Sequence, residues 1–252
     1  MLSDRAGHST AKDLYEGNNK YGKRFRTLDE LRELEEYNFK WHDDLQLTMP
    51  RQDVESIANF VKIQLEKTEP GAHVIICGGY RRGKSESNDV DLLITYPHED
   101  GKERGVLTAK VPKFSSVSGL IPPNGILSRT NCASERTSTE NKSASLMDSL
   151  DRAFVVFAHP PNNSTRDRVI FRRLDLIVTR WESWGSAVVG WTGSTQFERD
   201  LRTRAHELGY KFDSGGIRRI SDGLAIDAVT EEDVFRVLKV PWLPPELRNA
   251  DP

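Results

Sequence analysis

The chain has 252 residues, of which 37% are hydrophobic and 29% charged, and its formal net charge is −2. This length allows a sizeable core in one large domain or two small ones, and the composition is typical of a soluble protein. Two cysteines, Cys77 and Cys132, are too few for a disulfide framework or a four-ligand zinc site, which favours a reducing compartment. We expect neither secretion nor a membrane partner, because no apolar run reaches the length of a span and the first residues form no hydrophobic signal core. Nucleic-acid binding is not excluded, since it needs a local basic surface and not a basic total.

The first 50 residues are polar and predict short helical pieces. Thr27 is suited to cap a helix that carries Leu28, Leu31 and Leu34 at helical spacing. After Pro50, one face of residues 51–67 is apolar, which predicts an amphipathic helix. The residues of that face are Val54, Ile57, Ala58, Val61 and Leu65.

The middle of the chain predicts four strands. "AHVIICGG" (72–79) predicts a buried strand that ends in a glycine turn, and "DVDLLITYP" (89–97) predicts a strand that Pro97 stops. Residues 100–149 are rich in Ser, Thr, Asn and Pro, which predicts a long flexible loop. "RAFVVFAHP" (152–160) and "RRLDLIVTR" (172–180) predict two further strands, joined by a hairpin connection.

The chain changes character after Trp181. Residues 183–212 predict a helix, a glycine turn and a basic amphipathic helix. Thr230, followed by three acidic residues, predicts the start of a capped helix. We expect the proline-rich tail that follows to pack on the body of the protein.

Two carboxylates lie in a predicted buried strand, where charged residues are rare. Asp89 and Asp91 lie two residues apart in a predicted strand, so their side chains share one face. Two such carboxylates repel each other unless a cation lies between them, and oxygen ligands without His or Cys favour magnesium or manganese. If the strand that carries Asp175 is a neighbour, three aspartates converge, as in sites that hold two metal ions for phosphoryl transfer.

Glycines and basic residues precede the two aspartates. A strand that ends in Gly78 and Gly79 lets a phosphate approach the backbone, and a short helix after them offers free N–H groups to an anion. Arg82 and Lys84 add positive charge suited to a triphosphate.

Each of these pieces has an ordinary structural explanation when taken alone. Gly-Gly is typical of a turn, "RRGK" of a solvated basic turn, and D-x-D of a loop. Asp175 by itself fits a carboxylate paired with Arg172 or Arg173. Their joint order along the chain is far more specific, and it favours a nucleotide-binding metal site.

These motifs resemble a known family. "GGYRRGKSESNDVDLLITYP", "LDRAFVVF", "RRLDLIVTR", "GSAVVGWTGSTQFERDLRTRA" and "PWLPPELRNA" are similar to segments of the family X DNA polymerases, over about residues 51–250. The resemblance implies an α+β fold whose nucleotidyltransferase palm has a mixed or antiparallel sheet flanked by helices. It also implies a helical N-terminal fingers remnant (1–50), a palm (51–180) and a small α+β C-terminal thumb (181–252) that selects the nucleotide.

The resemblance also assigns roles in the palm. Asp89 and Asp91 correspond to carboxylates that bind both metals, and Asp175 to one that holds the metal at the primer 3′-hydroxyl. Arg173 corresponds to an arginine that hydrogen-bonds this last carboxylate. Gly79 and Arg82 correspond to triphosphate contacts, and Asn88 stands where the family has Gly or His beside the phosphates.

"GWTGS" (190–194) corresponds to the segment that packs on the sugar and base of the incoming nucleotide. Gly190 and Trp191 match the mu and terminal-transferase members, where the beta and lambda members carry Tyr-Phe. Because glycine removes side-chain bulk, we expect weak discrimination against ribonucleotides. The alternative is that Trp191 is only a core aromatic and the glycines form a turn.

Other residues of the C-terminal part complete this predicted nucleotide site. Gly193 and Ser194 belong to the same segment. Glu198 and Arg202 are expected to face the nascent base pair, with Arg202 matching a template contact and Glu198 replacing the Asn of the beta member.

Two regions depart from the family pattern. No segment that resembles the family's lyase domain precedes the fingers, so we expect no lyase activity. "RAGHSTAKDLY" resembles a shortened helix-hairpin-helix turn in which Gly7 remains as a DNA contact and Arg5 replaces the first glycine. The Ser-rich residues 119–149 stand where mu-like members carry a loop that substitutes for missing template.

The resemblance implies a DNA polymerase that transfers a nucleotide from a nucleoside triphosphate to a DNA 3′-hydroxyl, in short gap filling for DNA repair. The implied cofactor is two Mg²⁺ ions, which Mn²⁺ can replace. The implied partners are gapped or broken DNA, deoxy- and also ribonucleoside triphosphates, and proteins of a repair complex. The implied location is the nucleus. Two alternatives are a template-independent terminal nucleotidyltransferase and a DNA-end binding module without catalysis.

Overall fold

The computed structural model describes residues 12, 15, 16, 24, 26, 41–99, 101–107, 120–122, 125–130, 150–161 and 167–250. The chain divides into two compact units, Met1–Gln46 and Leu47–Pro252. The first unit contains the short helix α4 (His42–Leu45). Gly7, Cys132, the helix predicted after Thr27 and most of the loop predicted at 100–149 lie outside the described residues. The described part of that range includes the strand β5 (Ile126–Thr130), which pairs with β6, so the range is not all loop. The domain boundaries expected at residues 50 and 180 stay predictions.

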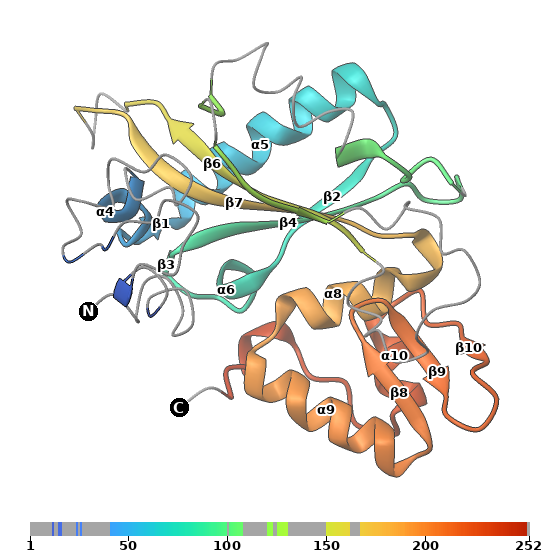
Figure 1. The fold of residues 1–252 in the computed structure, drawn as a ribbon. Helices are drawn as coiled ribbons and strands as arrows, with labels where there is room; N and C mark the ends of the chain where they lie inside the picture. The colour runs from blue at the N-terminus through green and yellow to red at the C-terminus, as the bar shows by residue number, and fades with distance from the viewer. Residues whose placement is uncertain are drawn as a thin grey trace. The chain divides into compact units, whose positions relative to one another are not determined.

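A five-stranded sheet forms the centre of the second unit (Figure 1). Its strands are β2 (His73–Ile76), β4 (Asp89–Thr95), β5 (Ile126–Thr130), β6 (Asp151–His159) and β7 (Ile170–Val178). They lie in the order β2-β4-β7-β6-β5, and β4 and β7 run parallel while the other neighbours are antiparallel. The expectation of a mixed sheet is therefore confirmed. A separate ribbon pairs β1 (Met49–Pro50) with β3 (Glu86–Ser87).

Helices cover both faces of this sheet (Figure 1). On one face lies α5 (Arg51–Thr68), and all five apolar residues predicted to form its inner face are buried. On the other lies α8 (Trp184–Thr192), which follows a 3₁₀ turn at Trp181–Ser183. Because side chains alternate along β4, Leu92 and Ile94 pack with α5, while Leu93 packs with α8.

The C-terminal subdomain has its own small core. Its elements are α9 (Thr195–Glu207), the three-stranded sheet of β8 (Tyr210–Asp213), β9 (Gly216–Arg219) and β10 (Ala225–Ile226), α10 (Glu231–Val237) and a 3₁₀ turn at Pro245–Leu247. Thr230 caps α10 in a reciprocal capping box with Asp233, as the sequence predicts. Val189 of α8 also belongs to this core, so α8 joins the subdomain to the sheet.

None of the helices in the described part of the chain is long and apolar enough to cross a membrane.

Candidate active site

The parallel pairing of β4 and β7 brings the three predicted aspartates together. Asp91 lies opposite Asp175, and Asp89 lies opposite Arg173. One carboxylate oxygen from each aspartate lies within 4.8 Å of the other two. The condition that the two strands be neighbours is thus met, although the strands lie far apart in the sequence. The alternation that turns Leu93 toward α8 turns the aspartates to the same face.

Electrostatic repulsion is strong in this cluster. Burial, followed by the charges of Asp89 and Asp175, holds the pKa of Asp91 well above its usual range. Burial likewise raises the pKa of Asp175, against the opposing effect of Arg173. Three clustered carboxylates with one arginine retain excess negative charge, and an all-oxygen donor set fits a hard divalent cation. These residues could therefore hold a metal ion.

Arg173 holds the most buried carboxylate in place. Its Nε donates to Asp175 Oδ1 at 2.8 Å and its Nη2 to Asp175 Oδ2 at 2.5 Å, while Nη1 lies 3.7 Å from Asp89 Oδ2. The guanidinium also lies 5.3 Å from the ring centre of Phe154, which is opposite Asp175 on β6. Of the two arginines considered as partners of Asp175, Arg173 makes this contact, whereas Arg172 donates to the carbonyl of Leu47 at 2.6 Å.

The carboxylate of Asp91 needs a glycine at the first position of the glycine pair. Gly78 has a φ of +58°, and a Cβ there would lie 2.0 Å from Asp91 Oδ2. The sequence predicts a short helix after the two glycines, but α6 spans Gly78–Arg81 and therefore begins at the first of them. A Cβ on Gly79 would lie 3.1 Å from Cδ of Lys84, so the side chain of Lys84 packs closely over this glycine.

The remaining predicted phosphate contacts differ in exposure. Lys84 and Asn88 are exposed to solvent. Arg82 is half-buried, and its Nη1 donates to the carbonyl of Thr192 at 2.5 Å while its Nε donates to Asn249 Oδ1 at 2.9 Å. The arginine thus connects the glycine loop to the C-terminal subdomain.

Gly190 lies buried within α8. A Cβ there would lie 2.3 Å from Ser214 Oγ, so the turn between β8 and β9 leaves no room for a side chain. Trp191 is half-buried and packs against the cluster between α8 and the sheet, as the alternative interpretation expects of a core aromatic. Gly193 has a φ of +71° beside Arg82, and Ser194 precedes α9 as its N-cap residue.

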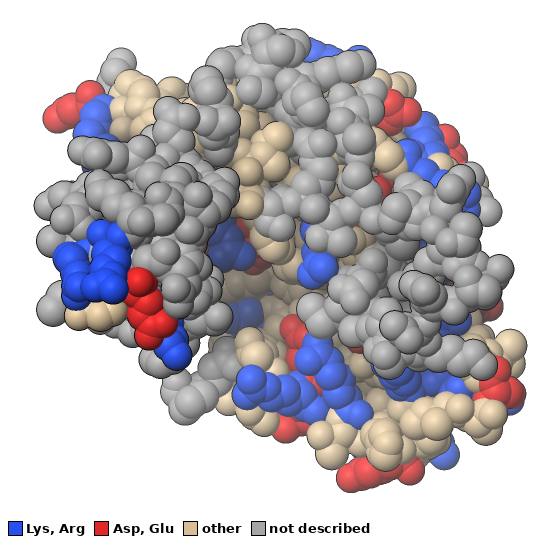
Figure 2. Space-filling model, viewed as in Figure 1, with Lys and Arg blue, Asp and Glu red and all other residues tan. Residues whose placement is uncertain are grey.

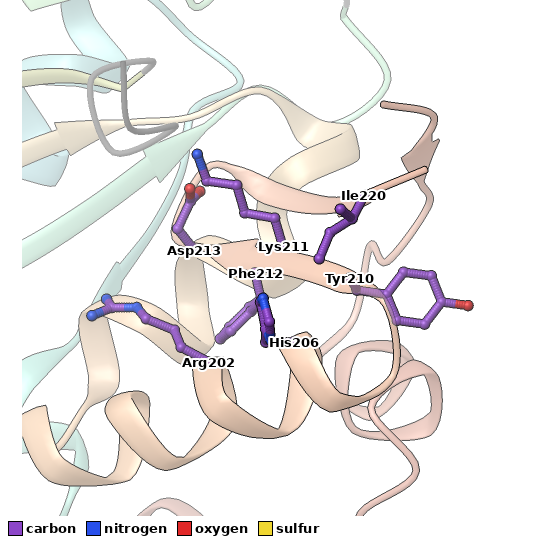
Figure 3. A pocket seen from close by; sticks show the side chains of 7 residues that line it. All are labelled: Arg202, His206, Tyr210, Lys211, Phe212, Asp213 and Ile220. Carbon is purple, nitrogen blue, oxygen red and sulfur yellow. The ribbon is translucent and has the colours of Figure 1, made fainter. Parts of the chain in front are cut away.

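Glu198 and Arg202 contact each other on α9 across one helical turn, at 2.5 Å between Oε2 and Nη2. Arg202 also lines an open pocket of about 440 Å³ between α9 and β8, together with His206 and Lys211 (Figure 3). Lys and Arg side chains show where α9 and β8 lie, with Asp and Glu side chains among them (Figure 2). The basic side chains of this surface could contact a polyanion.

A buried ion network joins the two subdomains. Arg81 of α6 donates to Glu231 of α10 through Nη1 at 3.0 Å and Nη2 at 2.5 Å. Arg248, which is 0% exposed, donates to Glu231 Oε1 at 2.6 Å. Burial alone would raise the pKa of Glu231, but the hydrogen bonds from the two arginines outweigh it and the pKa lies below its usual range.

Sequence reasoning missed several residues of this site, namely Phe154, Arg81, Glu231, Arg248 and Asn249. The contact of Phe154 with Arg173 depends on the pairing of β6 with β7, and no pattern in the sequence of β6 predicts it. The last two lie in "PWLPPELRNA", a tail whose resemblance to the family does not by itself reveal its contacts.

Comparison with known proteins agrees with this geometry. The family described as DNA polymerase beta palm matches residues 48–180, and the family described as DNA polymerase beta thumb matches residues 187–249. "DNA-directed DNA/RNA polymerase mu" of Homo sapiens is 35% identical over 246 residues, which cover 91% of this chain and 49% of that protein.

Two further relatives have similar coverage. "DNA nucleotidylexotransferase" of Xenopus laevis is 30% identical over 90% of this chain and 48% of that protein. "DNA polymerase lambda" of Arabidopsis thaliana is 28% identical over 96% of this chain and 44% of that protein. The chain spans about half the length of these relatives. From its palm and thumb and from these relatives, the chain belongs to the family X DNA polymerases, and it is similar to their mu and terminal-transferase members.

Proposed function

We propose that this protein is a DNA-directed DNA polymerase that joins a nucleoside monophosphate to a DNA 3′-hydroxyl and releases pyrophosphate. One observation carries the proposal. Asp89, Asp91 and Asp175 place carboxylate oxygens within 4.8 Å of one another, directly beside the glycine loop that ends β2. Within the described part of the chain, Arg173 is the basic residue paired with Asp89 and Asp175, which leaves the three carboxylates with excess negative charge suited to cations that also bind phosphates.

The three aspartates would hold two Mg²⁺ ions, which Mn²⁺ can replace, with Asp89 and Asp91 shared between both. Bound ions of this kind polarise phosphoryl oxygens and neutralise the charge that develops during in-line transfer. Asp175 would hold the ion on the 3′-hydroxyl side. Arg173 fixes Asp175 through two parallel hydrogen bonds, which leaves the other lone pairs of its carboxylate for the cation.

The glycine loop and the start of the thumb would bind the nucleotide. Arg82 and Lys84 offer positive charge to the triphosphate, and Gly78, Gly79 and Asn88 form the adjoining loop. The segment of Gly190, Trp191, Gly193 and Ser194, together with Glu198, would pack on the sugar and base.

Ribonucleotides are proposed as substrates beside deoxynucleotides. Gly190 has no side chain that could crowd a 2′-hydroxyl. A Cβ on Gly190 would lie 2.3 Å from Ser214 Oγ, so the packing of the β8–β9 turn also requires a glycine at this position.

DNA would be bound mainly through its phosphates, with Arg202 on the template side of α9. Gly7, the other proposed DNA contact, lies outside the described residues. The proposed role is short gap filling in DNA repair, in end joining or base excision repair, in the nucleus and with proteins of a repair complex.

A second candidate is template-independent addition of nucleotides to a DNA end. The similarity to "DNA nucleotidylexotransferase" of Xenopus laevis favours it, at 30% identity. The same carboxylates would serve both reactions, so only the dependence on template separates them. A DNA-end binding module without catalysis is the remaining alternative, and the intact carboxylate cluster argues against it, since it would repel DNA without a cation.

The test is extension of a one-nucleotide-gapped duplex and of a single strand, each with magnesium and with every deoxy- or ribonucleotide. Asp175→Ala and Asp175→Asn are expected to lower the rate about a hundredfold or more, because the first removes a metal ligand and the second removes its negative charge. Asp222→Ala, which changes an exposed aspartate in the thumb turn, is the control. Extension without template would favour the second candidate, and DNA binding without any extension would favour the binding module.

A further inference from the structure

Asn249 contacts both the side chain and the backbone of Arg82, 167 residues away. Its Oδ1 accepts from Arg82 Nε at 2.9 Å, and its Nδ2 donates to the carbonyls of Arg82 at 3.3 Å and of Glu246 at 3.0 Å. A guanidinium only donates and a carbonyl only accepts, so these contacts fix which end of the amide is oxygen. Both polar atoms of the Asn249 side chain thus contact Arg82, and its nitrogen also contacts Glu246.

A second segment holds the same guanidinium from another side. Its Nη1 donates to the carbonyl of Thr192 at 2.5 Å, and a Cβ on Gly193 would lie only 3.0 Å from this atom. An arginine side chain is flexible in solution and loses conformational freedom when it binds a ligand. Two fixed acceptors on different atoms remove most of that freedom before a ligand arrives.

One donor group of Arg82 stays free for a ligand. Among the described residues, no hydrogen-bond partner of its Nη2 is found. The charge of Arg82 also reaches Asp91, where it opposes the rise in pKa that burial causes. A fixed guanidinium with a free amino group beside metal-binding carboxylates is suited to bind a phosphate oxygen.

The segment that carries Asn249 is itself firmly attached. The N–H of Ser194 donates to the carbonyl of Arg248 at 3.2 Å, and the N–H of Ala250 donates to Ser194 Oγ at 3.1 Å. On its other side, the buried Arg248 is bonded to Glu231. Residues 248–250 therefore pair with the segment before α9 and carry Asn249 to a defined position.

We propose that Asn249 is a positioning residue for nucleotide binding: it orients Arg82 so that the free amino group of that arginine binds a phosphate of the nucleoside triphosphate. This inference rests on the proposed function. It assigns the 248–250 segment a part in substrate affinity, in addition to its part in packing. Asn249 acts on triphosphate affinity, and it leaves DNA binding and the transfer step itself largely unchanged.

The first test measures the dissociation constant of a deoxynucleoside triphosphate on the full chain bound to gapped DNA whose primer ends in a dideoxynucleotide, so that no turnover occurs. Asn249→Ala is expected to weaken this binding about tenfold, the effect of losing one hydrogen bond to a charged group. Affinity for the gapped DNA stays unchanged. In turnover with an ordinary primer, KM for the nucleotide rises while kcat stays nearly the same.

Two further variants separate positioning from a general loss of structure. Asn249→Leu keeps the volume of the side chain without its hydrogen bonds, and it should match Asn249→Ala. Leu247→Ala, directly before the 248–250 segment and 66% exposed, should bind like the unchanged protein. A loss of equal size in Leu247→Ala would overturn the inference.

A double variant decides whether Asn249 acts through Arg82. Asn249→Ala added to Arg82→Ala should cause no further loss of triphosphate affinity, because no guanidinium is left to position. The same loss in both backgrounds, or unchanged affinity of Asn249→Ala alone, would overturn the inference while the proposed function stands. If the unchanged protein binds no triphosphate, both fail together.

Discussion

Close packing around the carboxylate cluster restricts which residue type can stand at single positions. Gly78 shows this best, because its absent Cβ leaves the space that Asp91 Oδ2 occupies, 2.0 Å from the position a Cβ would take. The sequence favours a phosphate cradle at the glycine pair. The structure adds a steric reason, which is that the carboxylate of β4 needs this glycine in order to turn toward Asp175.

Gly78→Ala is expected to lower the free energy of unfolding by about 3 kcal/mol, from strain at positive φ together with displacement of a buried carboxylate. Gly223→Ala is the matched control, since Gly223 has a φ of +73° but no atom within 4 Å of the place that a Cβ would take. We expect the control to cost about 1 kcal/mol, as for a positive φ alone. Urea unfolding measures both, and equal losses would contradict a contact between residue 78 and Asp91.

At the scale of elements, the parallel pairing of β4 with β7 places the cluster, and α6 and α10 attach the thumb to it. The start of α10 carries Glu231, and both arginines that bind it come from outside that helix. When a buried carboxylate lies between two arginines, removal of one member strongly destabilises the folded protein, because a buried charge is left without its partner. Arg81 also donates to Thr192 Oγ1 at 2.9 Å, so this network holds the thumb segment 192–194 beside the glycine loop.

Glu231→Gln is expected to lower the free energy of unfolding by about 3 kcal/mol, because two half-buried or buried arginines lose their counter-charge. The lowered pKa of Glu231 sets the pH dependence. Its contribution is fully present above its ordinary value of 4.5 and is lost as the pH falls through the lower pKa of the folded state. Unfolding measured from pH 6 downward, through the lowered pKa of Glu231, should thus show the variant and the unchanged protein converging. Glu232→Gln, an exposed neighbour, is the control, and a constant difference at every pH would contradict the assignment.

At the scale of the whole molecule, the described part of residues 47–252 contains three buried clusters and its own sheets. Two of these clusters lie on opposite faces of the large sheet, and the third fills the thumb. Because α8 contributes to both the thumb core and the cluster at the sheet, palm and thumb share structure and are not merely tethered.

Residues 47–252 expressed alone are expected to unfold in one cooperative transition, since palm and thumb share α8 and the Glu231 network. Thermal unfolding followed by circular dichroism and by tryptophan fluorescence would give coincident curves. Added magnesium should raise the midpoint, as for any ligand that binds the folded state. Two separate transitions would show that the thumb unfolds independently.

The sequence by itself determined several local elements and the residue types of the site. It did not predict β5, which lies inside the range predicted as a loop, or β8, which begins inside the range predicted as a helix. Apolar spacing predicted α5, and alternation together with Pro97 predicted β4 and its end. Thr230 predicted α10, since capping depends on a few adjacent residues. The order of glycines, basic residues and D-x-D predicted the chemistry of the site, because those side chains lie within one short stretch.

Only the tertiary structure decided which distant residues meet. That β4 pairs with β7 in parallel, with Asp91 opposite Asp175, depends on sheet order and not on either strand alone. The same holds for Ser214 against Gly190 and for Asn249 against Arg82. Such contacts join residues that are far apart along the chain, and no local periodicity encodes them. They form because packing the shared core brings the segments together.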